Sequence, residues 1–164
     1  MKELTDSAIR ASFVNCSKGE ASRLSVPRDL ADLPWDDLDF LGWRDPAAPQ
    51  RSYLVTEREG ELVGFSLRVA PRGFGTQHRA MCSICLTTHS SDGVALMVGR
   101  KARTAGDTDN TVGEYICTDL SCSLYVRGKK RVQAGGRMQE SLTEEEKIER
   151  LQRKLSAFVD KLFQ

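Results

Sequence analysis

MCSIC at residues 81–85 and CTDLSC at residues 117–122 decide the fold of this 164-residue chain, because they place four of its five cysteines in two tight pairs. Two residues separate the cysteines of the first pair, and four separate those of the second. A two-residue gap lets both sulfurs of one turn reach a single ion at about 2.3 Å, and four thiolates complete a tetrahedral sphere. The spacing therefore predicts one structural Zn²⁺ per chain, with no open position for a substrate. Its predicted ligands are Cys82, Cys85, Cys117 and Cys122.

The expected compartment favours a metal over two disulfides. No run of the sequence approaches the roughly 18 apolar residues that span a bilayer, and the opening residues, MKELTDSAIRASF, lack the continuous apolar stretch of a secretion signal. We therefore expect a cytoplasmic protein, in which thiols stay reduced. The fifth cysteine, Cys16, is expected to be a buried apolar filler on an opening helix. Two unrelated buried pairs of cysteines are the alternative to a metal site.

The elements expected around the cysteines follow the order of a treble-clef zinc finger. The first pair stands in a turn, GVALMVGRKA at 93–102 and TVGEYIC at 111–117 predict two strands, and Cys122 lies at the start of a helix. The ion would fasten the turn to that helix and contribute on the order of 10 kcal/mol to folding. The sequence thus predicts an α+β fold built on a treble-clef zinc finger of turn, β-hairpin and helix.

Two parts are distinguished along the chain. The first part, residues 1–70, is predicted to contain an N-terminal helix and a β-hairpin. Between them, the Pro-, Trp- and Asp-rich segment at 33–46 is expected to form a short helix or turn. Residues 71–164 predict the zinc-binding domain, which ends in a helix with a capping box formed by Thr143 and Glu146. This last helix is expected to dock on the body through one apolar stripe. The stripe consists of Ile148, Leu151, Leu155, Phe158, Val159 and Leu162.

The middle of the chain is basic. Residues 64–137 carry 11 Lys and Arg against 5 Asp and Glu, between mildly acidic flanks. Such a basic stretch favours an anionic partner, either a nucleic acid or an acidic protein surface. The strongest candidate contact is VRGKKRVQAGGR at 126–137, for which a solvated tail of the preceding helix is the alternative.

Nothing in the residue pattern favours catalysis. His78 and His89 flank the first cysteine pair, and either could replace a sulfur, but four cysteines already suffice. We therefore expect both histidines in a loop or behind the ligands. A cysteine nucleophile with a histidine base would need one thiol released from the metal. The expectation is a protein that is not an enzyme.

The quoted motifs carry a family resemblance. MCSICLTTH, GVALMVGR, VGEYICTDLSCSLYVRGKK and the capped closing helix resemble the carboxy-terminal treble-clef domain of the elongation factor G-binding proteins. These include the fusidic acid resistance proteins of the FusB type. The resemblance runs from about residue 78 to the end, and the amino-terminal part looks like a shorter bacterial branch of the same group.

The resemblance implies a function. The zinc domain would bind elongation factor G and promote its release from the ribosome, including release of a factor locked there by fusidic acid. Contacts in this family are attributed to a face of the zinc domain, which here suggests Tyr115, Arg127, Lys129 and Lys130. Of these, only Tyr115 belongs to the specific YIC motif before the third ligand, and the other three are chosen for their charge. The alternative is a zinc module that binds RNA or DNA directly through its basic middle stretch.

Overall fold

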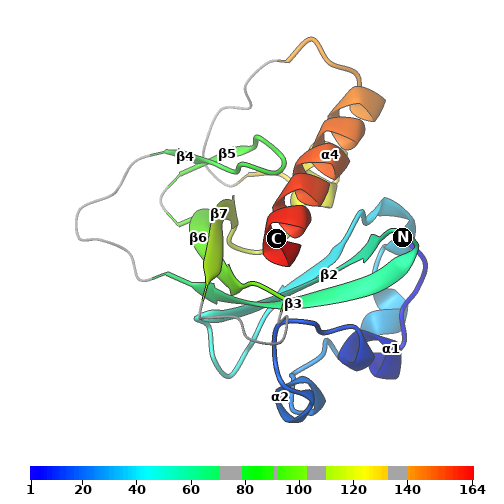
Figure 1. Ribbon diagram of the computed structural model, residues 1–164. Helices are drawn as coiled ribbons and strands as arrows, with labels where there is room; N and C mark the ends of the chain where they lie inside the picture. The colour runs from blue at the N-terminus through cyan, green and yellow to red at the C-terminus, as the bar shows by residue number, and fades with distance from the viewer. Residues whose placement is uncertain (71–78, 91, 103–109, 133–139) are drawn as a thin grey trace.

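A five-stranded antiparallel sheet lies at the centre of the fold (Figure 1). The computed structural model describes residues 1–70, 79–90, 92–102, 110–132 and 140–164. The strand order is β1-β2-β3-β6-β7, so the sheet joins strands from both predicted parts of the chain. The predicted boundary between residues 70 and 71 stays a prediction. The strands are β1 Leu41–Arg44, β2 Arg51–Arg58, β3 Glu61–Val69, β6 Val94–Arg100 and β7 Thr111–Cys117.

The turn between β2 and β3 explains the longest strand pair. Glu59 and Gly60 both have positive φ, 54° and 84°, as a two-residue turn that matches the twist of its strands requires. Arg58 then pairs with Glu61, and the register continues to Arg51 opposite Arg68. The hairpin predicted within residues 1–70 is therefore present.

The segment at 33–46 differs in part from the expectation of a short helix or turn. The short 3-10 helix η2, Trp35–Asp37, agrees with it, but Leu41–Arg44 forms strand β1. Another 3-10 helix, η1 Leu30–Asp32, precedes the segment. Leu41 pairs with Val55 and Trp43 with Tyr53, which buries both side chains of β1. The strand is therefore stabilised by β2, a partner that local sequence signals do not reveal.

The opening helix is shorter than the pattern suggested. Helix α1, Asp6–Ala11, is capped by Thr5, whose side chain accepts a hydrogen bond from the Ala8 amide. It ends at Ser12, after which the chain bridges to β3, so Cys16 lies outside the helix. Cys16 is half-buried rather than buried, which corrects the expectation of a fully buried filler. A second helix, α2 Lys18–Ser22, follows with its own capping box.

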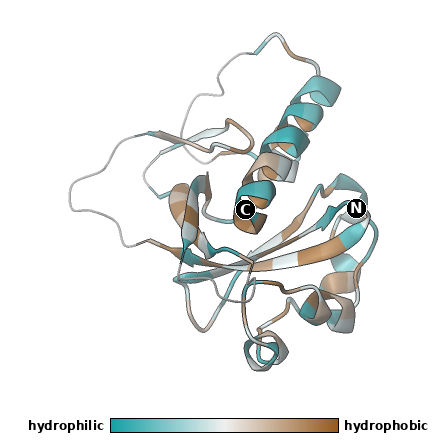
Figure 2. Ribbon diagram, in the orientation of Figure 1, coloured by the Kyte–Doolittle hydropathy of each residue, from teal (hydrophilic) through white to brown (hydrophobic). Residues whose placement is uncertain are grey.

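The metal-binding half adds a small hairpin and two helices. Strands β4 Ala80–Met81 and β5 Thr88–His89 pair with each other, and helix α3, Cys122–Val126, follows β7. Helix α4, Glu144–Phe163, begins with the predicted capping box and lies across one face of the sheet, opposite α1 and α2 (Figure 1). Figure 2 shows hydrophilic and hydrophobic residues interspersed along α4. Its predicted stripe faces the core: Leu151, Leu155, Phe158, Val159 and Leu162 are buried, and Ile148 packs beside them.

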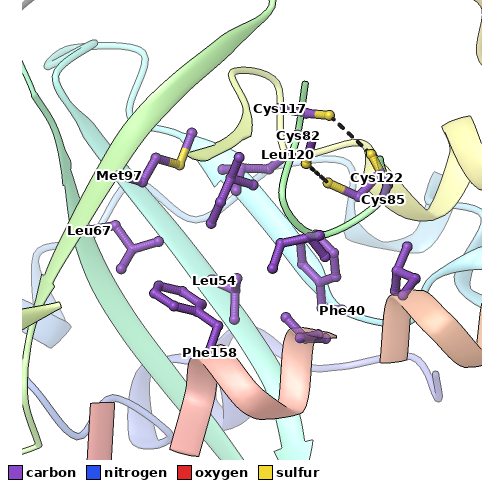
Figure 3. Packing of buried hydrophobic residues seen from close by; sticks show 14 of the residues in the cluster. Phe40, Leu54, Leu67, Cys82, Cys85, Met97, Cys117, Leu120, Cys122 and Phe158 are labelled. Carbon is purple, nitrogen blue, oxygen red and sulfur yellow. Dashed lines mark hydrogen bonds between the residues drawn. The ribbon is translucent and has the colours of Figure 1, made fainter. Parts of the chain in front are cut away.

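Two apolar clusters hold these elements together. The larger lies between α4, the sheet and the cysteines, with Met97 and Phe158 almost fully buried in it (Figure 3). Phe65 is buried in the same cluster. The smaller surrounds Trp35 and Trp43 on the side of α1. Among the described residues, no helix is both long and apolar enough to cross a bilayer.

Candidate metal centre

The four predicted zinc ligands come from three separate elements. Cys82 and Cys85 lie in the turn between β4 and β5, Cys117 is the last residue of β7, and Cys122 is the first residue of α3. Backbone hydrogen bonds close the turn, from the Leu86 amide to the Cys82 carbonyl at 2.9 Å and from the Cys82 amide to the Thr87 carbonyl at 3.0 Å. Local backbone bonding therefore aims both sulfurs of the turn toward the end of β7.

The distances between the sulfurs fit a tetrahedral ion. All four Sγ atoms lie within 4.8 Å of one another, and all four residues are buried. Cys82 and Cys122 are 3.7 Å apart at Sγ, and Cys85 and Cys117 are 3.5 Å apart (Figure 3). A disulfide would need about 2.05 Å, whereas four sulfurs at about 2.3 Å from one zinc ion are separated by about 3.8 Å. The donor set is therefore that of one structural Zn²⁺.

Hydrogen bonding among the thiols prepares the site for a cation. Hydrogen bonds from Cys117, and then from Cys122 and Cys85, hold the pKa of the Cys82 thiol well below its usual range. At Cys122, hydrogen bonds with Cys117 and Cys82 and complete burial raise the pKa instead. The thiolate form is thus favoured at Cys82 and the protonated thiol at Cys122. A divalent ion at the centre would displace the protons of the thiols and neutralise part of the charge of the thiolates.

His89 lies directly behind one ligand. Its Nε2 is 3.3 Å from Cys117 Sγ, so with the proton on Nε2 the ring donates to that sulfur. Burial lowers the pKa of His89, which favours the neutral ring. Gly93 leaves room for the ring, since a Cβ at that position would be 2.5 Å from His89 Nδ1. His89 supports the ligand set without belonging to it, and His78 lies outside the described residues.

An ionic and aromatic network covers the loop between the third and fourth ligands. The Tyr125 hydroxyl donates to Asp119 Oδ2 at 2.8 Å, and Lys130 Nζ lies 2.8 Å from the same oxygen. The Tyr125 ring in turn packs edge-on against His89, with centroids 4.9 Å apart. These contacts join helix α3 to the metal loop in addition to the link that the ion itself would provide. These residues were not among the predicted ligands, and only the nearness of Asp119 to the cysteines in sequence hinted at them.

The four predicted partner contacts differ in their surroundings. Tyr115 lies on β7 with 53% of its surface exposed, and its carbonyl accepts from the Ser83 amide in the metal turn. The Arg127 side chain is only 11% exposed and pairs with Asp39 at 2.6 Å. The two lysines are more exposed, and each pairs with one carboxylate: Lys129 with Asp37, and Lys130 with Asp119. The partner role of all four stays a prediction.

Comparison with known proteins agrees with this geometry. A family model described as the FBP C-terminal treble-clef zinc finger matches residues 8–162. The chain belongs to this family. A search of curated proteins finds no match.

Membership of the FBP zinc-finger family extends further along the chain than the sequence motifs suggested. The motifs that indicated it begin near residue 78, but the match begins at residue 8, within α1, and includes the 3-10 helices and the β2–β3 hairpin. The continuous sheet and the ion pairs between residues 37–39 and 127–129 give a physical reason. The family describes the zinc-binding domain of elongation factor G-binding proteins, and in this chain the N-terminal part is packed into that domain.

Proposed function

We propose that this protein binds elongation factor G through the surface around Tyr115 and promotes release of the factor from the ribosome in the cytoplasm. Family membership supports the choice of partner. The observation that carries the choice of surface is the exposure of Tyr115, because the ring is 53% accessible while the other two tyrosines are buried. Exposed aromatic side chains are frequent anchors of protein interfaces.

The zinc ion has an indirect role in this proposal. The Tyr115 carbonyl accepts a hydrogen bond from the Ser83 amide at 2.8 Å, and Ser83 stands between the two ligands of the metal turn. Cys117 follows Tyr115 by two residues on the same strand. The ion would therefore help to fix the backbone from the Tyr115 carbonyl to Cys117. The proposed action involves no catalysis, because all four thiolates would be ligands in a buried, closed site.

Lys129 and Lys130 are assigned a supporting role. Their side chains are 56% and 42% exposed, so they remain accessible to an acidic surface while paired with Asp37 and Asp119. Rim charges of this kind speed encounter more than they strengthen a complex. Arg127 contributes by holding α3 against Asp39, since its guanidinium is almost fully covered.

Release would follow from unequal affinity for two states of the factor. A partner shifts a conformational equilibrium only by the difference in its affinity for the two conformations. The protein would therefore bind the departing conformation of elongation factor G more tightly than the ribosome-bound one. Protection against fusidic acid would be one consequence, because the drug holds the factor on the ribosome after GTP hydrolysis.

Titration of purified elongation factor G with the zinc-loaded protein tests the partner and the surface together. Replacing Tyr115→Ala should weaken binding at least tenfold, as expected for an aromatic anchor, while the zinc content stays at one ion per chain. Thr111→Ala removes another exposed side chain from the same strand and should change the affinity less than twofold. Absence of a complex with the wild-type protein, or equal affinities for wild type and Tyr115→Ala, would overturn the proposal.

A release assay tests the second step. Ribosomes carrying elongation factor G stalled by fusidic acid should lose the factor faster when the wild-type protein is added, and the Tyr115→Ala variant should be slower. Binding without faster release would support elongation factor G as the partner but would contradict the proposed release mechanism.

Direct nucleic-acid binding through residues 126–137, of which the structure describes 126–132, has less support. Three of the described cations of this stretch, Arg127, Lys129 and Lys130, each pair with a carboxylate of the protein. Phosphates would have to compete with these carboxylates.

A further inference from the structure

A cavity of about 610 Å³ opens at the end of the sheet, on the side of α2 and away from the zinc site. Arginines from α2 and from three neighbouring strands line it, and we call it the arginine cleft. The four are Arg23, just after α2, Arg51 on β2, Arg68 on β3 and Arg100 on β6. None of them belongs to the surface around Tyr115 proposed for elongation factor G.

The strand register places three of these arginines on one face of the sheet. Arg51 stands directly opposite Arg68, and Arg68 stands opposite Val98, two residues before Arg100. Directly opposed and alternate residues of an antiparallel sheet point to the same face. Since neighbouring strands are about 4.8 Å apart, the backbones that carry these three arginines lie within a width of roughly 10 Å. Like charges in this arrangement repel one another unless something neutralises them.

The hydrogen bonds of the two carboxylates that line the cleft come from neutral groups, although Glu20 also interacts electrostatically with Arg100 and Arg23. Asp45 accepts from the Tyr53 hydroxyl at 3.0 Å and from the Ala47 amide at 2.9 Å. Glu20 accepts from the amide and the hydroxyl of Ser17 in the capping box of α2. Within the described part of the chain, none of the four arginines of the cleft forms an ion pair.

Arginines that line two other cavities do have carboxylate partners. Arg58 pairs with Asp160 at 3.0 Å and Arg127 with Asp39 at 2.6 Å in the cavity beneath α4. In the cavity beside Cys85, an arginine of α4 likewise pairs with Glu140. The arginine cleft differs from both, because its four arginines outnumber its two carboxylates, Glu20 and Asp45, and form no ion pair with them.

The wall of the cleft is held in place by a buried amide. The Asn15 side chain, with 5% of its residue surface exposed, donates to the carbonyls of Ser66 at 3.0 Å and Arg100 at 2.9 Å. Its oxygen accepts from the Ser66 amide at 2.8 Å. This one side chain fastens the segment after α1 to β3 and β6, so the backbones that carry Arg68 and Arg100 are fixed relative to each other. The cleft is preformed rather than assembled by a ligand.

We propose that the arginine cleft binds linked phosphate groups, those of a nucleotide or of an RNA strand. The planar guanidinium donates two parallel hydrogen bonds to phosphate oxygens, which suits arginine to this ligand better than to a halide or a single carboxylate. Four arginines around a cavity that extends over three strands exceed what one phosphate can contact, so the ligand carries at least two. The site is independent of the proposed grip on elongation factor G, and it would give the protein a second, anionic partner.

Two probes distinguish the sources of phosphate. Inorganic tripolyphosphate represents a nucleotide chain and is measured by calorimetry; a fluorescent decauridylate represents single-stranded RNA and is measured by anisotropy, both at low salt. Decauridylate binding with a log–log salt slope of about −1.4 or steeper, which corresponds to two or more neutralised phosphates, assigns RNA. Binding of tripolyphosphate with no binding of decauridylate assigns a small polyphosphate ligand. Either result supports the site once the variants below agree.

The variant Arg68→Gln/Arg100→Gln removes two charges from the cleft at nearly constant size. It should weaken binding of whichever probe binds by at least tenfold, and it should reduce the salt slope for decauridylate. The control Arg28→Gln/Arg153→Gln removes two exposed charges that lie outside the cleft and should change the affinity less than twofold. Both variants should retain one zinc ion and bind elongation factor G as the wild type does, so this test and the test at Tyr115 can fail separately. Absence of binding of both probes to the wild type, or equal losses in the two double variants, would overturn the site.

Discussion

Leu120 lies so close to Gly42 that no side chain fits between them. A Cβ placed on Gly42 would be 2.6 Å from Leu120 Cβ and 2.9 Å from the edge of the Phe40 ring. Leu120 stands in the loop between the third and fourth zinc ligands, has a positive φ of 56° and is 4% exposed. Gly42 is in the middle of β1. The metal loop therefore rests directly on the N-terminal strand, and the two parts of the chain depend on each other for packing.

Gly42→Ala should therefore destabilise the protein and loosen its hold on zinc. The added methyl group would force Leu120 or the strand to move, and overpacking of this kind costs about 1–3 kcal/mol. Urea unfolding should report that loss, and competition with a chromophoric chelator should show faster transfer of zinc. Gly113→Ala is the matched control on an exposed strand, where the nearest atoms are the movable ends of Leu96 and Val98. Equal stability of the two variants would contradict the close seating of the metal loop.

His89→Ala should lower the affinity for zinc by about 10- to 100-fold, the usual effect of removing a group that hydrogen-bonds to a ligand. The reason is the loss of the donor that lies 3.3 Å from Cys117 Sγ. Chelator competition at constant pH measures the change. Gly93→Ala should produce a similar loss with the histidine still present, because its Cβ would be 2.4 Å from His89 Cβ. Thr88→Ala is the control in the same strand, and an equal effect there would remove the role assigned to the ring.

The ligand set and the cap of the last helix were predictable because their signals are local. Cys82 and Cys85 are close in sequence, and the spacing of each pair is set by the geometry of one ion. The capping box of Thr143 and Glu146 and the stripe along α4 likewise follow from spacings of three and four residues. Strand pairs joined by short turns, such as β2 and β3, are likewise predictable from local sequence signals.

Contacts between distant parts of the chain could not be predicted in this way. Asp39 and Arg127 are 88 residues apart, and nothing in either neighbourhood specifies the other. Arg127 was assigned to a partner on charge alone, whereas its charge is largely balanced within the protein. Strand β1 was missed for the same reason, since four residues without a turn signal depend on β2 for their conformation. The arginine cleft is also a product of register, which brings together residues of four different segments.

Helix α4 packs against the sheet through buried apolar side chains, so truncating one of them should strongly destabilise the protein. Leu151 is fully buried against the sheet and the metal half, so Leu151→Ala should cost about 2–5 kcal/mol. Arg153→Ala, two residues further on the exposed side of the same helix, should stay within about 0.5 kcal/mol of the wild type. Urea unfolding at one protein concentration measures both. Similar midpoints for the two variants would show that α4 does not contribute its apolar face to the core.

The ion pair between Asp39 and Arg127 predicts a stability difference that depends on pH. Burial alone would raise the pKa of the Asp39 carboxyl, but hydrogen bonds from Arg127 and Gln152 outweigh it and lower that pKa. In the unfolded chain the same carboxyl titrates near 3.9. The unfolded state therefore binds more protons between the two values, and the stabilisation is complete above about pH 4 and lost as the pH falls through the folded value.

Asp39→Asn should accordingly cost about 3–5 kcal/mol at pH 7, because it leaves the guanidinium of Arg127 without its partner in a site where the arginine side chain is only 11% exposed. The gap between variant and wild type should narrow as the pH is lowered below about 4, since the wild type then protonates the same carboxyl. Urea unfolding of both proteins over this range measures the gap, and comparison at each pH cancels the loss of zinc that acid causes in both. Asp36→Asn, at an exposed neighbouring position, should show no such gap at any pH. A difference between Asp39→Asn and wild type that stays constant with pH would mean that Asp39 acts through packing rather than through its charge.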